Sequence, residues 1–450
     1  MKKQKNPISR PAAETPDALP ALAWPAEALT PLALVALIFS VTTVLSGMAH
    51  QPMWRDHLAT DVTEFSIRAA KFVDGTLQGS EYPPVAVFWF LFIRLLERVT
   101  ATPYHDVFMS MNALLLGLHV AFLNQIAGRR SALLFAGLCL AAGPILMYRF
   151  ELFATMLVIL TWYAWVREKP RLAGALLGAA VLTKMYPLVL TALVLRKPRP
   201  QAPAPREGDP PPTWLAWLFD GGWQIGPVLS GLAVSVFFAL ALFSLGGSPL
   251  GIMGDVMKFH EAKPVGVESV PAAVAMVVYR LLGMWPPPYA NTWGIHGLLV
   301  PSFPRLLCLL GMLATFAALH LPLRHVARGG ESARFILTGQ ALLLAVNFWT
   351  TLYQPQYLLW PLSLTALLPL ALQRPRELEV FGWTYAAALM AEQVIYPCSY
   401  SRFLLIFQQG APFGDLLLAL AVGKLGLAAL FVMAMRAALR DETVASAQEA

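Results

Sequence analysis

The sequence predicts an all-α, polytopic transmembrane bundle, and three observations support this fold class. Of the 450 residues, 57% are hydrophobic and 13% are charged, which is more apolar surface than a water-soluble fold can cover with polar side chains. Stretches such as Thr30 to Ala49 and Ser302 to Leu321 have few charges and the length of about 20 residues that crosses a bilayer as helix. Long period-two alternation, typical of membrane strands, is missing. We therefore expect about 11 to 13 helical spans and exclude a water-soluble enzyme.

The chain is expected to consist of two membrane modules that a proline-rich linker joins. The linker has seven prolines between residues 196 and 220, a composition typical of a spacer rather than a folded domain. The basic N-terminal tail is longer than the basic region of a cleavable signal, so the first span is expected to be a retained anchor. The expected parts are a cytoplasmic N-terminal tail at 1–29, an N-terminal transmembrane module at 30–195 with a first outer loop at 50–83, a cytoplasmic linker at 196–221, a C-terminal module at 222–438 with a large outer loop at 247–301, and a cytoplasmic C-terminal tail at 439–450.

Arginine placement predicts the orientation of the C-terminal half. Three short basic segments interrupt its apolar runs, and they contain Arg324, Arg328 and Arg334, then Arg374 and Arg376, then Arg436 and Arg440. Cytoplasmic loops are enriched in Lys and Arg, so these segments are expected inside and residues 247–301 outside. The net charge of +7 is thus explained by basic loops that orient the protein in the membrane, and no nucleic-acid partner is expected. The absence of an Asn-x-Ser/Thr sequon fits the cytoplasmic membrane of a bacterium.

Basic residues in the middle of the chain are too closely spaced for simple alternation of spans. They fall at 129–130, 167–171 and 196–199, and each group favours the cytoplasm. Two arrangements remain: plain alternation that violates the charge bias twice, or a hairpin of short helices within 172–195 with its apex at Thr183 to Pro187. We favour the hairpin, because irregular backbone is tolerated in a membrane where protein or water surrounds it. The number of crossings between residues 84 and 195 stays open.

The first outer loop has more acidic than basic side chains. Within it, residues 61–75 predict an amphipathic helix that lies on the outer membrane surface and stops at Gly75. Its apolar face is expected to contain Val62, Phe65, Ala69, Phe72 and Val73. Asp61 is expected to cap the start of this helix, with Glu64 three residues on, or to act as a functional carboxylate, and the two roles are compatible.

Three short motifs stand in an order that resembles a known enzyme family. The first motif is Asp61 at a helix start after the first span, followed by Tyr82-Pro83-Pro84 at the start of the second span. The others are Leu182-Thr183-Lys184-Met185-Tyr186-Pro187 and Gln354-Pro355-Gln356-Tyr357-Leu358-Leu359-Trp360-Pro361. Together they resemble the GT-C glycosyltransferases, in particular the polyprenyl-phosphate-mannose-dependent enzymes of glycosyltransferase family 87, over about residues 30 to 370.

The resemblance implies transfer of a hexose, with mannose as the first candidate, from a polyprenyl-phosphate donor to a glycolipid or glycan acceptor at the outer face, with inversion. Asp61 would be the general base, a role worth about 10²–10⁴-fold in rate. Arg149, Lys184 and Tyr186 would bind the donor phosphate, because a cation among apolar residues is a functional candidate by default. A competing interpretation is that Arg149 or Lys184 extends to the membrane interface or pairs with Glu151, and that Tyr186 is an interfacial aromatic.

Further candidates lie at helix starts and in the outer loops. Tyr82, Gln356 and Tyr357 would contact the substrate, although a proline after Gln354 is equally a sign of helix initiation. His296, with His260 as an alternative, would orient the acceptor or share its proton. Against this, a loop histidine is more often solvated or packed.

No metal, disulfide or cofactor is expected. Asp56 and Asp61 have four residues between them, so the loop lacks the Asp-x-Asp of some GT-C relatives. The three cysteines Cys139, Cys308 and Cys398 are odd in number and form no CxxC pair, which favours packing roles.

A transporter or flippase of a sugar or a lipid-linked sugar is the main alternative, because about a dozen spans with both ends inside is common among carriers. It predicts internal repeats and paired broken helices near the bilayer midplane. No convincing repeat relates residues 30–196 to 222–436, and the acidic residues gather in a loop. A lipid-linked polysaccharide polymerase or ligase would have outer loops rich in arginine and histidine, and the sequence lacks that pattern.

Overall fold

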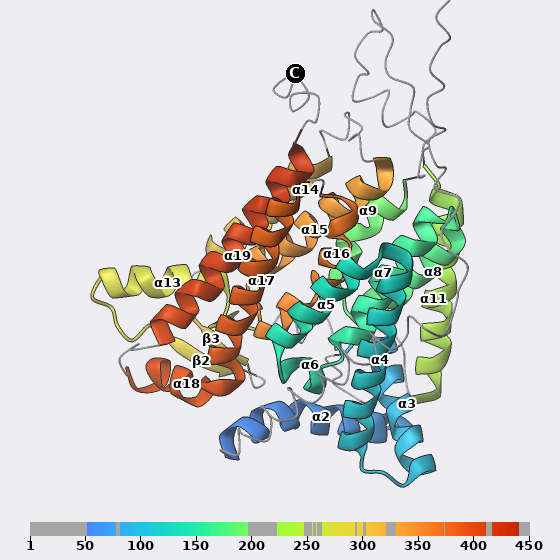
Figure 1. Ribbon diagram of the computed structural model, residues 1–450. Coiled ribbons are helices and arrows are strands. Elements are labelled where there is room, and N and C mark those ends of the chain that lie inside the picture. The colour runs from blue at the N-terminus through green and yellow to red at the C-terminus, as the bar shows by residue number, and fades with distance from the viewer. Residues whose placement is uncertain are drawn as a thin grey trace, which may run out of the picture.

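The computed structural model describes residues 52–77, 82–196, 223–246, 254, 258, 263–292, 295–299, 303–320, 330–372, 374–410 and 416–440. Helices account for most of these residues (Figure 1), so the predicted all-α class is confirmed in its main part. The predicted first span, most of the proline-rich linker and both chain ends lie outside the described residues, as do Arg324, Arg328 and His260.

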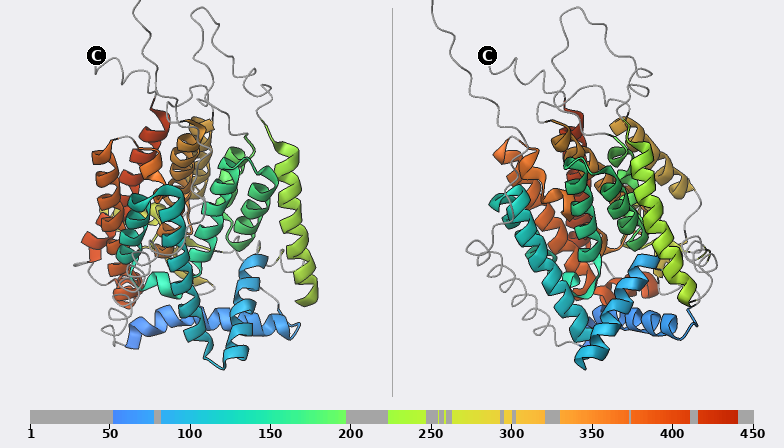
Figure 2. Two further views of the ribbon diagram at one scale, coloured as in Figure 1. Left: turned by 45° about the vertical axis from the view of Figure 1, so that its right-hand side comes forward. Right: turned by 90° about the vertical axis from the view of Figure 1, so that its right-hand side faces the viewer.

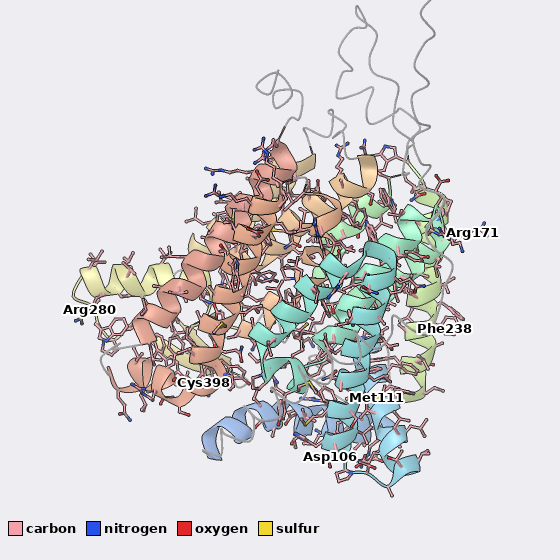
Figure 3. All side chains as sticks on the ribbon, in the orientation of Figure 1. Asp106, Met111, Arg171, Phe238, Arg280 and Cys398 are labelled. Carbon is pink, nitrogen blue, oxygen red and sulfur yellow. The ribbon has the colours of Figure 1, made fainter. Side chains whose placement is uncertain are left out.

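Long apolar helices with exposed apolar side chains indicate a membrane protein. Three described helices are long and apolar enough to cross a bilayer, and they are Tyr104–Ala127, Ile225–Leu245 and Leu418–Leu439. On the second, Phe237 and Phe238 are 69% and 62% exposed, and Phe238 points away from the bundle (Figure 3). Such exposure suits lipid better than water. The total number of spans and their orientation stay predictions.

Helix α2 (Pro52–Val73) lies across one end of the bundle, transverse to the long helices (Figures 1 and 2). Its described part extends from Pro52, nine residues before Asp61. Asp61 therefore lies in the helix interior, and the predicted capping role of Asp61 is wrong. The predicted apolar face is buried at Val62, Phe65, Ala69 and Phe72. Val73, at the last helical position, is half exposed, and Gly75 with φ +65° ends the helix as predicted.

Aromatic packing fixes α2 on the bundle. The next elements are α3 (Pro84–Thr100), α4 (Tyr104–Ala127), α5 (Arg129–Ala142) and the short α6 (Ile145–Tyr148). The Phe65 ring of α2 stacks on Phe90 of α3 at 4.4 Å between centroids and meets Phe150 edge-on at 5.4 Å. Asp61 lies one turn before Phe65 on the same helix face, so these rings also set the position of its carboxylate.

Residues 172–195 turn back on themselves, in agreement with the predicted hairpin. Helix α7 (Glu151–Val166) runs away from α2, and α8 (Pro170–Thr183) returns toward it (Figure 1). Helix α8 stops at Thr183, and the chain turns back through the 3₁₀ helix η2 (Tyr186–Leu190) and α9 (Thr191–Val194). The two arms of the hairpin, α8 on one side and η2 with α9 on the other, are each shorter than the roughly 20 residues of a full span. The apex at Lys184 therefore lies within the bundle.

Close packing against α11 (Ile225–Gly246) positions α8. A side-chain carbon on Gly174 or on Gly231 would overlap a backbone carbonyl oxygen of the partner helix. The Ser235 hydroxyl of α11 donates a hydrogen bond of 2.6 Å to a carbonyl of α8. Small and hydroxylated residues that let backbones approach are typical of helix pairs in membranes. The position of Lys184 at the end of α8 depends on this contact.

A small antiparallel sheet in the predicted large outer loop departs from the all-α expectation. Its strands are β1 (Val265–Gly266), β2 (Tyr289–Thr292) and β3 (Ile295–Leu298), in the order β1-β3-β2. Leu298 pairs with Val265 on one side and with Tyr289 on the other. Helix α13 (Val270–Leu281) lies between β1 and β2 in the sequence. The sheet packs its apolar side chains against Phe403 and Phe407.

The C-terminal half contains long helices and several interrupted ones. Its elements are α14 (Phe303–His320), α15 (Gly330–Trp349), η3 (Pro355–Leu359), α16 (Leu362–Thr365), η4 (Leu368–Leu370), α17 (Pro375–Gln393), the π-helical η5 (Val394–Cys398), α18 (Tyr400–Gln409) and α19 (Leu416–Leu439). Helix η3 begins at Pro355, so Gln354-Pro355 does initiate a helix, as the alternative interpretation held. Inside the bundle, Lys424 Nζ donates a hydrogen bond of 2.6 Å to Glu392 Oε1, and both residues are buried.

Candidate functional site

Asp61 on α2 forms an ion pair with Arg149. Arg149 Nη1 contacts the Asp61 carboxylate, and Nη2 donates a hydrogen bond to the Tyr396 hydroxyl. The arginine side chain is 4% exposed and the aspartate side chain 34%, so the carboxylate is the accessible end of the pair. A buried guanidinium needs an anion and acceptors to offset its desolvation. Asp61 supplies the anion and Tyr396 supplies one acceptor, whereas the buried Arg149 Nε has no hydrogen-bond partner among the described residues.

Arg149 lies in a two-residue break between α6 and α7. Its backbone is extended, with φ −124° and ψ 150°. Asn112 Nδ2 donates hydrogen bonds to the carbonyls of Met147 and Arg149 at 2.8 and 2.9 Å. Carbonyls at a helix end lack intrahelical donors, so the Asn112 amide stabilises the break. Arg149 and Glu151 therefore lie on either side of Phe150 at this corner between α6 and α7. Each of them forms one of two ion pairs.

Lys184, directly after α8, forms the second ion pair with Glu151 Oε1. The Glu151 side chain is 1% exposed and the Lys184 side chain 16%. Lys184 Nζ lies 4.7 Å from the centre of the Phe150 ring and 5.5 Å from the centres of Tyr357 and Trp360, within the range of cation–π attraction. The alternative that Glu151 pairs with one of the two cations is thus correct for Lys184.

Tyr186 and Tyr357 lie in one stack of rings beside Lys184. Trp360 stacks on Tyr186 at 4.6 Å and on Tyr357 at 3.8 Å between centroids. In the described part of the chain, the buried Tyr186 hydroxyl has no hydrogen-bond partner. An unsatisfied buried hydroxyl calls for an explanation, and a ligand that accepts its hydrogen would supply one. The second and third sequence motifs therefore meet in space, where Tyr186 of the second stacks on Trp360 of the third.

Tyr82 and Gln356 flank this cluster. The Tyr82 ring packs edge-on against Phe65 at 5.5 Å and against Phe150 at 5.8 Å. Gln356 is 7% exposed, and its Nε2 donates a hydrogen bond of 2.6 Å to Gln354 Oε1. Tyr82 thus supports the corner that carries Arg149, whereas Gln356 is held within its own motif.

His296 lies at a distance from the two ion pairs. Its Nδ1 shares a hydrogen bond with the Tyr289 hydroxyl. The His296 ring lies 5.9 Å from that of Tyr400, which in turn lies 5.0 Å from that of Tyr396. Two tyrosine rings therefore separate His296 from Arg149, and the structure does not bring His296 against Asp61 as a shared acid–base group would require.

A second buried acidic group, to which the sequence analysis assigned no role, lies next to Tyr400. Glu268 follows β1, is 5% exposed and shares a hydrogen bond with the Tyr400 hydroxyl. Burial raises the pKa of the Glu268 carboxyl from 4.5 to about 7, although Tyr400 and the positive charge of Lys424 lower it in part. Lys424 is a cation in the apolar middle of α19, whose other charge, Arg436, lies in the last turn. That internal charge could have indicated this cluster from the sequence.

Among the described residues, no three His, Cys, Asp or Glu side chains lie close enough together to hold a metal ion. Cys139 and Cys308 are buried and Cys398 is exposed, and none of the three forms a disulfide. The chemistry available at the site is therefore that of one accessible carboxylate, two largely buried cations and aromatic hydroxyls.

No family model matches the chain, and neither a curated protein nor a solved structure matches it with significance. The fold and the site alone define the class: a helical membrane protein with two linked ion pairs and a stack of aromatic rings near the end of its bundle that α2 covers. The resemblance to GT-C glycosyltransferases stays a prediction.

Proposed function

We propose that this protein is an inverting glycosyltransferase of the GT-C type in the bacterial cytoplasmic membrane. It would transfer a hexose, with mannose as the first candidate, from a polyprenyl phosphate to a glycolipid or glycan hydroxyl at the outer face. The observation that carries the proposal is the accessible carboxylate of Asp61 beside the buried cation of Arg149, with Lys184 held nearby through Glu151 and Phe150. A base and a cationic site for a phosphate leaving group are what this reaction needs.

In the proposed reaction, Asp61 accepts the proton of the acceptor hydroxyl. The acceptor oxygen forms a bond to the anomeric carbon while the bond from that carbon to the phosphate oxygen breaks, which inverts the configuration. The phosphate leaves with the electron pair of the broken bond as a stable anion, so no acid is required. The 34% exposure of the Asp61 side chain supports this role, because an acceptor must reach the base.

The donor phosphate is proposed to bind between Arg149 and Lys184. Arginine pairs with phosphate through two parallel hydrogen bonds, and such charge-assisted bonds are among the strongest in proteins. The Tyr186 hydroxyl, buried without a partner among the described residues, would donate to a further phosphate oxygen. Movement of the Arg149 guanidinium from Asp61 toward the phosphate would also free the Asp61 carboxylate for the acceptor proton.

The remaining candidates have supporting roles in this proposal. Tyr357, 3.8 Å from Trp360 in the ring stack, and Gln356 beside it are proposed to contact the sugar. Tyr82 supports the Arg149 corner. His296 acts through Tyr400 and Tyr396, so it orients groups near the acceptor rather than exchanging a proton with Asp61.

The test is sugar transfer from polyprenyl-phosphate mannose in membranes that contain matched amounts of wild type, Asp61→Asn and Asp74→Asn. Asp74 is an exposed carboxylate just after α2 and serves as the matched control. We expect Asp61→Asn to lower transfer about 10²-fold or more and Asp74→Asn to leave it unchanged. Equal transfer by wild type and Asp61→Asn would remove the general base from the proposal.

Transport stays the alternative, and interrupted helices favour it. Helix α8 stops at Thr183, and Tyr396 interrupts the helical segment after α17 with extended backbone. Discontinuous helices often form the substrate sites of transporters. Wild type that transfers no sugar from several polyprenyl donors, yet moves a sugar or a lipid-linked sugar across proteoliposome membranes, would favour transport.

A further inference from the structure

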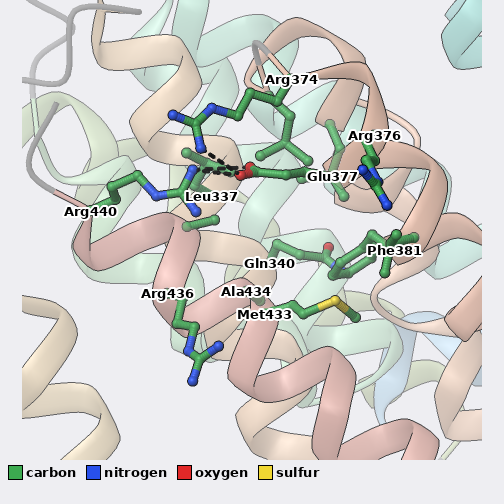
Figure 4. Close-up of a pocket in the computed structure, with 14 residues that line it drawn as sticks. Leu337, Gln340, Arg374, Arg376, Glu377, Phe381, Met433, Ala434, Arg436 and Arg440 are labelled. Atoms are coloured by element: carbon green, nitrogen blue, oxygen red, sulfur yellow. Dashed lines mark hydrogen bonds and ion pairs between the residues drawn. The ribbon is translucent and has the colours of Figure 1, made fainter. Parts of the chain in front are cut away.

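Four arginines line a cavity of about 380 Å³ at the end of the bundle opposite α2 (Figures 1 and 4). The start of α17 and the end of α19 form its rim, and α15 and η4 form its floor. The four arginines are Arg374, Arg376, Arg436 and Arg440. The positive-inside rule assigns this end to the cytoplasm. The cavity is thus remote from the Asp61 site and has no part in the proposed reaction.

One carboxylate balances only part of this charge. Glu377 pairs with Arg374 at 3.5 Å and with Arg440 at 2.8 Å. Figure 4 shows the Glu377 carboxylate between these two guanidinium groups, with Arg376 and Arg436 on other sides of the cavity. No carboxylate within the described part of the chain pairs with Arg376 or Arg436, and both side chains are exposed. The cavity therefore has a net positive charge and two guanidinium groups available to an anion.

The floor of the same cavity is apolar except for Gln340. It is lined by Leu337, Leu368, Leu372, Phe381 and Met433. A small hydrophilic anion gains nothing from such a surface, whereas hydrocarbon chains are favourably transferred onto it. On the same helix as Arg376, Val380 and Trp383 are 49% and 77% exposed, an exposure that suits contact with the hydrocarbon region of a membrane. The cavity thus combines a cationic rim with a largely apolar floor.

We infer that this cavity binds an anionic phospholipid of the cytoplasmic leaflet, with its phosphate at Arg376 and Arg436 and its acyl chains along the apolar floor. Basic pockets between membrane helices on the cytoplasmic side are suited to anionic headgroups, and guanidinium groups match the geometry of phosphate oxygens. The lipid would join the start of α17 to the end of α19, two helices that Glu377 and Arg440 already connect.

The test measures lipid binding to the purified full-length protein in neutral detergent by native mass spectrometry. Phosphatidylglycerol and phosphatidylcholine of equal chain length are titrated against wild type, Arg376→Gln/Arg436→Gln and Arg129→Gln/Arg130→Gln. The last variant is the control, because it removes two exposed arginines that lie outside the cavity. We expect wild type and control to prefer phosphatidylglycerol over phosphatidylcholine. We expect Arg376→Gln/Arg436→Gln to bind phosphatidylglycerol at least about tenfold more weakly than wild type does.

Three results would overturn the inference. The first is equal binding of phosphatidylglycerol and phosphatidylcholine by wild type. The second is an equal loss in both double variants, which would mean that only the general positive field matters. The third is displacement of phosphatidylglycerol by inorganic phosphate at the same concentration, which would identify a free-phosphate site. Because the variant arginines are exposed, size-exclusion chromatography is expected to show all three proteins folded alike.

Discussion

The carboxylate of Asp61 pairs with the guanidinium of Arg149. This ion pair links α2, which covers one end of the bundle, to the buried break between α6 and α7. Arg149 contacts Tyr396 at the same time. The pair is asymmetric, because one partner is accessible and the other is not. This asymmetry lets the two partners be tested separately.

Arg149→Lys keeps the positive charge but loses the paired donor geometry of the guanidinium. We expect Arg149→Met to lower kcat/KM for the polyprenyl-phosphate donor about 10²-fold, the scale of losing one donor at a developing negative charge. Arg149→Lys is expected to fall between Arg149→Met and wild type. Initial rates at varied donor concentration measure this, and an unimpaired Arg149→Met enzyme would show that the donor phosphate binds elsewhere.

Variants of the Lys184–Glu151 pair allow its contribution to stability to be measured separately from its contribution to sugar transfer. Glu151→Gln leaves the Lys184 charge without its buried partner, which typically costs about 3–5 kcal/mol. The double variant Glu151→Gln/Lys184→Met removes both charges and is expected to recover most of that stability. Sugar transfer is expected to be lost in both variants, because neither has a paired cation at the ring stack. Thermal unfolding in detergent and the transfer assay give the two readouts. Recovery of transfer in the double variant would show that the pair is only structural.

Glu268 makes stability depend on pH. Its pKa is raised from 4.5 to about 7 in the folded protein, so the folded state holds a proton that the unfolded state has released between these values. Stability is then expected to fall as pH rises from about 4.5 to 7 and to change no further above that, with a total of roughly 3 kcal/mol. Glu268→Gln is expected to remove this fall, as measured by unfolding midpoints at several pH values. The other groups that face Glu268, namely Tyr400, Lys424 and Glu392, are unchanged in the variant. A wild-type slope that persists in Glu268→Gln would assign the titration to another group.

The contact between α8 and α11 can be tested with two glycines of one helix. A methyl group at Gly231 would overlap a backbone oxygen of α8, whereas a methyl group at Gly226 would meet nothing within 4 Å. We expect Gly231→Ala to destabilise the fold by about 1–3 kcal/mol. Gly226→Ala is expected to be neutral or slightly stabilising, because alanine favours helix. Equal unfolding midpoints for the two variants would mean that the helices separate at little cost.

Several features of the fold could be predicted from the sequence, because they follow from charge and apolar patterning. A hairpin apex within Thr183 to Pro187 was predicted from basic residues too closely spaced for full spans, and α8 does end at Thr183. The buried face of α2 follows the helical period of its apolar residues. The motif residues Asp61, Lys184 and Tyr357 come from distant segments, and the structure brings their elements to the same region.

Other features depend on side-chain geometry that no local pattern records. Tyr396 lies 247 residues from Arg149 in the sequence, and nothing near either residue indicates their contact. The choice of partners, Arg149 with Asp61 and Lys184 with Glu151, is likewise a property of the folded corner at Arg149–Phe150. Asp61 resembled a helix cap because the apolar period begins just after it, but the described helix already includes Pro52.

Three cations and three carboxylates meet inside the described bundle, and the pairs are Arg149 with Asp61, Lys184 with Glu151, and Lys424 with Glu392. Each pair is neutral as a unit. A transmembrane voltage does work on net charge, about 2.3 kcal/mol for each elementary charge moved through 100 mV, and it has little to act on in a neutral pair. The stability of the empty protein is therefore expected to be insensitive to the energised state of the cell.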